Sequence, residues 1–162
     1  MRHLVGLLAF VLAGLAPVGS AAEDITWRAT SVQGPRTPAM NTRLGVAMFS
    51  GNEAATYERK IAAAAPPQDG KLAVNVESVY RFADGSTLVM RSRETINLTP
   101  QNTHGRDEWT GNGEIATGTG RFAGATGTFT FRAVMGLDRQ ADGMLGDSFL
   151  AGQGRYQLPP AK

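Results

Sequence analysis

Short segments in which apolar and polar residues alternate recur from Ile25 to Leu158, separated by turns rich in Gly, Asp and Asn. A period of two places successive side chains on opposite faces of an extended strand. The sequence therefore predicts an antiparallel, all-β protein with about eight strands. We expect these strands over residues 25–33, 44–50, 53–65, 72–82, 88–98, 108–117, 128–137 and 147–158.

The segment Glu53–Ala65 is the ambiguous one among these. Its Ala, Glu, Lys and Arg residues favour a helix, which the two prolines that follow would end. Its β-branched and aromatic residues suit a strand, and the preceding Gly51-Asn52 favours a tight turn back from segment 44–50. We predict a strand here.

The clearest hairpin joins segments 72–82 and 88–98. Both alternate regularly, and Asp84-Gly85 between them is expected to supply the positive backbone angles of a two-residue turn. A second such reversal is expected at Asp142-Gly143.

Eight antiparallel strands left as an open sheet would expose two edges, which are sites of aggregation, and closure removes them. We therefore predict a closed eight-stranded antiparallel barrel, with a two-sheet sandwich as the alternative. The interior of such a barrel is just wide enough to be filled by side chains or to hold one small ligand.

Residues 1–22 have the pattern of a secretory signal peptide: a basic start at Arg2, an apolar run over 4–16, and small residues Ser20 and Ala22 before the expected cut after Ala22. The apolar run is roughly a dozen residues, below the ~20 that a membrane-spanning helix needs, and no membrane span is expected after cleavage. We expect a periplasmic or secreted protein with one barrel domain over 23–158 and a C-terminal tail over 159–162.

Composition excludes several classes of function. The formal net charge is only +2 among 162 residues, so no nucleic-acid partner is implied. There is no cysteine, and His104 is the only histidine after the expected cut, so neither a disulfide nor a metal site is predicted. The glycines Gly118, Gly120 and Gly124 precede a strand pattern and not a helix, so they do not predict a nucleotide site, and no cofactor is expected.

The glycine-rich run over 118–127, Gly-Thr-Gly-Arg-Phe-Ala-Gly-Ala-Thr-Gly, is followed by the alternating residues 128–131. With segments 52–57 and 80–88, it resembles the pattern of allene oxide cyclase-like and dirigent-like β-barrels, in particular their bacterial secreted members. The resemblance implies a calycin-like barrel with a cavity for small hydrophobic molecules, and often a trimer in plant members. From the residues themselves we expect structural turn roles for Gly118, Gly120, Gly124 and Gly127, with Phe122 as a plug, because glycine permits positive φ angles and close backbone approach.

Charged residues on otherwise apolar strand faces are the candidate site, because an ionised group is costly to bury unless it is paired or functional. Glu94 and Ser92 share a face with Leu88, so an inward orientation would place the Glu94 carboxylate in or near the cavity. Arg59, which shares a face with Tyr57, is the candidate partner of Glu94. A structural ion pair and a binding pocket both fit this pattern.

Four aromatic residues in the predicted strands are candidates for the wall of a ligand cavity, although aromatic strand residues are more often core. They are Trp27, Tyr57, Tyr80 and Trp109. Several strands carry apolar residues on both faces, so the pattern does not choose which face points inward.

Three functions fit these observations. The first is a secreted or periplasmic barrel that binds a small, mainly hydrophobic molecule. The second is a cyclase-like or dirigent-like enzyme in which Glu94 steers a reactive intermediate, although the acidic and asparagine residues of the plant enzymes have no match here and no catalytic residue is assigned. The third is a structural module that forms a dimer or trimer through a face carrying Val79, Val89 and Val134.

Overall fold

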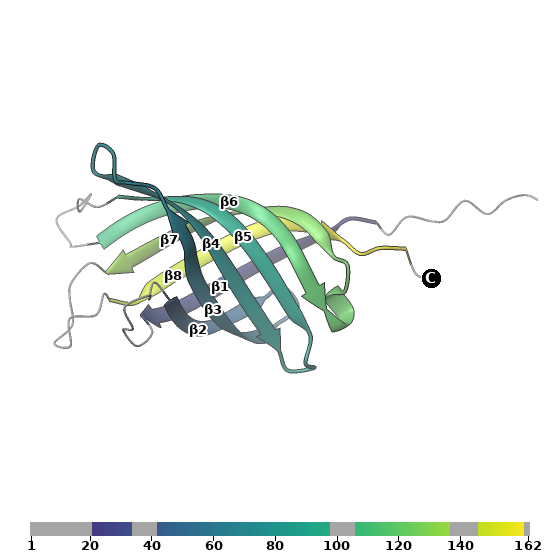
Figure 1. Ribbon diagram of the computed structural model, residues 1–162. Coiled ribbons are helices and arrows are strands. Elements are labelled where there is room, and N and C mark those ends of the chain that lie inside the picture. The colour runs from purple at the N-terminus through teal and green to yellow at the C-terminus, as the bar shows by residue number, and fades with distance from the viewer. Residues whose placement is uncertain (1–20, 34–41, 98–105, 137–145, 161–162) are drawn as a thin grey trace, which may run out of the picture.

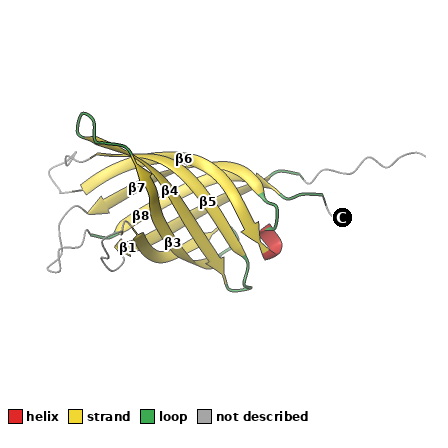
Figure 2. Cartoon of the chain, viewed as in Figure 1, coloured by secondary structure: helices red, strands yellow, loops and turns green. Residues whose placement is uncertain are grey.

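The computed structural model describes residues 21–33, 42–97, 106–136 and 146–160. Eight strands form one closed antiparallel barrel in which each strand pairs with its neighbours in the chain and β8 pairs with β1 (Figures 1 and 2). The strands are β1 Glu23–Gln33, β2 Thr42–Phe49, β3 Glu53–Ala64, β4 Lys71–Phe82, β5 Thr87–Asn97, β6 Arg106–Thr119, β7 Thr126–Gly136 and β8 Ser148–Gln157. One 3₁₀ turn, η1 Gly120–Phe122, lies between β6 and β7.

The predicted closed eight-stranded barrel is confirmed, and the sandwich alternative is excluded. The ambiguous segment is strand β3, in which Ala55, Tyr57 and Arg59 point inward and alternate with more exposed residues. A helix would have placed Tyr57 on the side opposite Ala55 and Arg59. Most of the expected signal peptide lies outside the described residues. No helix in the described ranges is long and apolar enough to cross a bilayer.

Of the two predicted turns that the structure describes, one has the expected geometry and the other differs. Gly51 and Asn52 both have positive φ angles, +82° and +62°, as a tight reversal between β2 and β3 requires. Between β4 and β5 only Gly85 has a positive φ, +81°, so the prediction of a two-residue turn was wrong. Asp84 instead accepts hydrogen bonds from the backbone N–H and the hydroxyl of Ser86, which stabilise a longer connection. The expected turn at Asp142-Gly143 lies outside the described residues.

The glycine-rich run forms the connection between β6 and β7, including η1. Gly120 and Gly124 have φ angles of +59° and +74°, which favour glycine. A Cβ at Gly118 would overlap Phe122, and one at Gly127 would overlap the backbone of β8. Phe122 is buried, and its ring centroid lies 5.1 Å from that of Phe82. This connection therefore closes one end of the barrel with an aromatic side chain.

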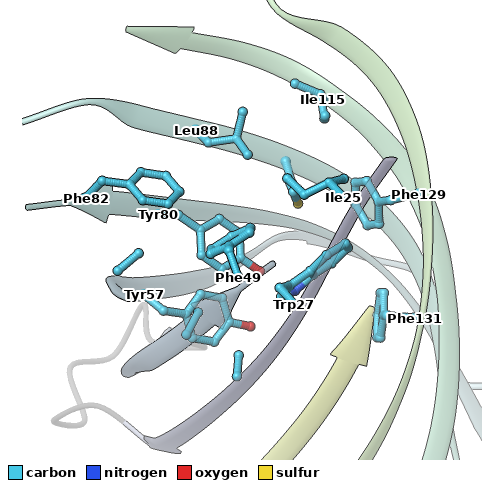
Figure 3. Packing of buried hydrophobic residues seen from close by; sticks show 14 of the residues in the cluster. Ile25, Trp27, Phe49, Tyr57, Tyr80, Phe82, Leu88, Ile115, Phe129 and Phe131 are labelled. Carbon is cyan, nitrogen blue, oxygen red and sulfur yellow. The ribbon is translucent and has the colours of Figure 1, made fainter. Parts of the chain in front are cut away.

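Aromatic rings fill much of the interior toward this end (Figure 3). Trp27 stacks on Phe49 with 6.1 Å between the ring centroids, and Tyr57 stacks on Tyr80 at 5.0 Å. Such contacts add to the stability that comes from burying the rings. The buried aromatic residues are Trp27, Phe49, Tyr57, Tyr80, Phe82, Trp109, Phe122, Phe129 and Phe131.

The structure settles which face of each strand points inward. On β2, Ala47 and Phe49 face the core, whereas the apolar residues Leu44, Val46 and Met48 are exposed on the outer wall. The reason is the pairing of Phe49 with the inward-facing Trp27 on β1, since paired residues share a face. Two outward valines, Val79 and Val89, pair with each other across β4 and β5.

We expect the variant Gly152→Ala to destabilise the barrel. Gly152 on β8 pairs with Trp27, and a Cβ there would overlap the indole ring, so the core would have to shift. Overpacking of this kind typically costs about 1–3 kcal/mol. Chemical denaturation would measure the loss, with the exposed neighbour Gln153→Ala as the control. Equal free energies of unfolding for the two variants would contradict the assigned register.

Candidate functional site

The buried polar side chains gather in the part of the interior farther from η1. They come from seven different strands and lie mainly near the strand ends that connect β1 to β2, β5 to β6 and β7 to β8. We call these residues the polar cluster: Ser31, Arg43, Arg59, Ser78, Ser92, Glu94, Asp107 and Ser148. The barrel interior thus has an aromatic part and a polar part.

Glu94 is the best-satisfied member of the polar cluster. It is only 1% exposed and forms an ion pair with Arg59. Its other oxygen accepts a hydrogen bond of 2.7 Å from the Ser92 hydroxyl, and Trp109 donates its indole N–H to the carboxylate at 2.9 Å. The Arg59 guanidinium also lies 5.7 Å from the centroid of the Trp109 ring. The predicted pairing of Glu94 with Arg59 is therefore confirmed.

Arg43, at the start of β2, is buried but uses neutral acceptors. Its guanidinium donates to the Ser31 backbone oxygen at 2.9 Å, to the Ser31 hydroxyl at 3.2 Å and to the Gly146 oxygen at 2.7 Å. Burial, together with the positive charge of nearby Arg59, lowers the pKa of Arg43. Within the described ranges no carboxylate forms an ion pair with Arg43, so the cluster holds a second buried cation beside the paired one.

Asp107, at the start of β6, is the least satisfied member. The residue is 0% exposed, and neither of its carboxylate oxygens has a hydrogen-bond partner in the described part of the chain. Burial raises the pKa of Asp107, against a smaller opposing effect of the Asn97 side chain. Most buried polar groups in proteins have a partner, so a buried carboxyl without one is an exception that a functional role would explain.

The predicted site residues separate into two groups. Glu94, Ser92, Arg59 and Trp109 come together as one hydrogen-bonded unit. Tyr57 adjoins this unit: burial raises the pKa of Tyr57, while the positive charge of Arg59 acts against this rise.

The other two predicted residues, Trp27 and Tyr80, belong to the aromatic part of the interior (Figure 3). Their rings pack edge to face with 6.5 Å between centroids. Burial raises the pKa of Tyr80 well above its usual value, so its phenol is neutral. They pack with each other as core residues do.

Sequence reasoning missed Arg43 and Asp107. The strands predicted over 44–50 and 108–117 began two residues too late, which left both side chains in loops. Extending the alternation by one position would have found them, because Arg43 shares a face with Phe49 and Asp107 shares a face with Trp109.

No group of three or more His, Asp or Glu residues in the described ranges is arranged to hold a metal ion, and His104 lies outside those ranges. Comparison with protein families, with curated proteins and with solved structures finds no match to this chain. The barrel and its polar cluster are therefore the features from which a function is inferred.

We expect the buried pair to be strongly coupled. Glu94→Gln leaves the Arg59 charge unpaired and should cost about 3–5 kcal/mol of unfolding free energy. The double variant Arg59→Met/Glu94→Gln should be more stable than Glu94→Gln alone, because no unpaired charge remains. The exposed pair Arg91 and Glu77 is the matched control, with a coupling energy of about 1 kcal/mol or less. Equal coupling energies in the two cycles would contradict a desolvated pair.

A pH dependence follows from the raised pKa of Asp107. Such a carboxyl stabilises the fold in its protonated form below its unfolded pKa, about 3.9, and this contribution is lost as the pH rises through the folded pKa. Asp107→Asn keeps a neutral side chain at every pH. The melting temperature of the variant, relative to the unmodified protein, should therefore be higher at pH 7 than at pH 3.

Glu114→Gln on the same strand serves as the control for Asp107→Asn, since it removes an exposed carboxylate. If the difference in melting temperature caused by Asp107→Asn were the same at pH 3 and pH 7, the burial of an unsatisfied carboxyl would be ruled out.

Proposed function

We propose that the protein binds a small molecule with a mainly apolar body, whose polar group meets the polar cluster inside the barrel. The observation that carries this proposal is the unsatisfied carboxyl of Asp107, which is fully buried in the same part of the interior as two guanidinium groups. A purely structural core would be more stable with apolar residues at these positions.

The charges of the polar cluster favour a ligand with an oxygen acceptor, such as a carboxylate or a carbonyl. Arg43 forms no ion pair in the described ranges, and Arg59 shares the single carboxylate of Glu94 with two other donors, Ser92 and Trp109. Asp107, with its raised pKa, donates a hydrogen bond when protonated. The aromatic rings next to the cluster offer contacts for the apolar body of the ligand.

The family and the location of the protein are part of the same proposal. The closed eight-stranded barrel and the glycine-rich connection between β6 and β7 support a calycin-like barrel of the allene oxide cyclase-like or dirigent-like type. The sequence pattern over residues 1–22 supports export to the periplasm or the medium. No residue matches the catalytic groups of the plant enzymes, so we propose binding as the function and leave catalysis unassigned.

We expect decanoate, which joins an apolar chain to a carboxylate, to bind at one molecule per chain in a calorimetric titration. Arg43→Met and Asp107→Ala should each weaken binding by about tenfold or more, since each removes a buried donor worth about 1.5–3 kcal/mol. Arg93→Met, an exposed arginine on β5, is the matched control and should leave the affinity unchanged.

Phe149→Glu tests whether the probe attaches to the exposed apolar side chains of the outer wall and not to this site. Decanoate binding that is lost in Phe149→Glu and kept in Arg43→Met would place the probe outside the barrel and contradict the proposal. Absence of binding for both decanoate and decanol would contradict it as well.

A further inference from the structure

The exposed large hydrophobic residues lie on one side of the outer wall. In the described ranges they belong to β1, β2 and β8, and Phe149 is the most exposed, at 60%. They are Val32, Leu44, Val46, Met48 and Phe149. A hollow of about 770 Å³ lies among Val46, Met48 and Phe149, with Arg28, Arg132 and Glu108 also on its lining.

Strand pairing fixes the order of these residues across the wall. One row runs from Val46 on β2 through Thr30, Phe149 and Val134 to Glu108 on β6. The neighbouring row carries Arg28 on β1, Ala151 on β8 and Arg132 on β7. Phe149 and Val134 are direct partners, so they form an apolar centre with Arg28 to one side and Glu108 to the other.

The charges around this apolar centre form no ion pair with any described residue of the chain. Arg28, Arg132 and Glu108 form no ion pair in the ranges that the structure describes. Elsewhere on the outer wall, charges do pair: Arg91 with Glu77 at 3.1 Å and Arg155 with Asp24 at 2.8 Å.

The remainder of the outer wall differs in character. A row of directly paired positions on β3, β4, β5 and β6 carries Lys60, Glu77, Arg91 and Glu114 in alternating sign. Alternating charges suit contact with water. Exposed apolar side chains on the opposite side therefore mark an interaction surface.

We propose that this apolar face binds the same face of a second copy of the chain in a twofold dimer. We consider a twofold axis that lies in the interface and runs along the strands, between Val134 and Phe149. This axis places the Phe149 side chain of each copy on the Val134 side chain of the other. The same axis exchanges β1 with β6, because these strands flank the β7–β8 pair. Thr30 on β1 then lies directly opposite the partner's Glu108. Arg28 is two residues from Thr30 along the same strand, so its long side chain lies within reach of the partner's Glu108.

The distribution of charge selects a second copy as the occupant. In a twofold interface a residue i of one copy contacts residue j of the other, and j contacts i, so Arg28 on β1 and Glu108 on β6 are complementary across the axis. Arg132 on β7 then lies over the partner's Ala151. A lipid surface would favour basic residues alone around the apolar centre, and Glu108 opposes that arrangement.

Sedimentation velocity of the purified chain over a range of concentrations tests this proposal. We expect a reversible dimer, and we expect Phe149→Glu to remain monomeric with an unchanged circular dichroism spectrum. Gln153→Glu is the matched control, since it adds the same charge to an exposed position of the same strand outside the apolar centre. It should dimerise like the unmodified protein.

A charge exchange provides the sharper experiment. Arg28→Glu and Glu108→Arg should each weaken dimerisation by about fivefold or more, and the double exchange should restore it, as expected for a pair worth about 1 kcal/mol across an interface. A monomer at all concentrations would overturn the proposal, as would a trimer, a dimer that survives Phe149→Glu, or single exchanges without effect. None of these outcomes bears on decanoate binding inside the barrel.

Discussion

The pairing of β1 with β8 is the constraint on which the rest of the structure depends. It joins residues 23–31 to residues 148–156 and closes the sheet, so every strand has one face inside. Closure is staggered: following paired residues once around the barrel from Gly118 on β6 leads back to Asp107 on the same strand. Because of this stagger, residues near the ends of different strands meet inside the barrel, and the polar cluster forms there.

The closed interior has two parts, which have opposite effects on the stability of the barrel. Stacked rings such as Trp27 on Phe49 bury large apolar areas near η1 and stabilise the barrel. Arg43 and Asp107, in the other part, are desolvated at a cost to stability. A barrel tolerates such residues only when the rest of its core offsets their cost in stability. Their presence is therefore more informative about function than the presence of the aromatic rings.

The sequence predicted the strands well because alternation is a local property. It also predicted that Arg59 meets Glu94, since both interrupt apolar faces. It did not predict the inward face of β2, because Leu44, Val46 and Met48 form an apolar face that pairing with β1 turns outward. The register between paired strands determines which face points inward, and the sequence of one strand alone does not reveal that register.

The same register keeps the two proposed surfaces apart. Ser148 and Phe149 are neighbours on β8, yet Ser148 belongs to the polar cluster and Phe149 to the outer apolar face. A slip of β8 by one residue would exchange them and place a phenylalanine among the buried polar groups. The indole of Trp27 lies where any Cβ at its partner, Gly152, would be, so only glycine fits at this point. That close contact opposes the slip, and one glycine therefore keeps the interior polar cluster and the outer apolar face on opposite sides of β8.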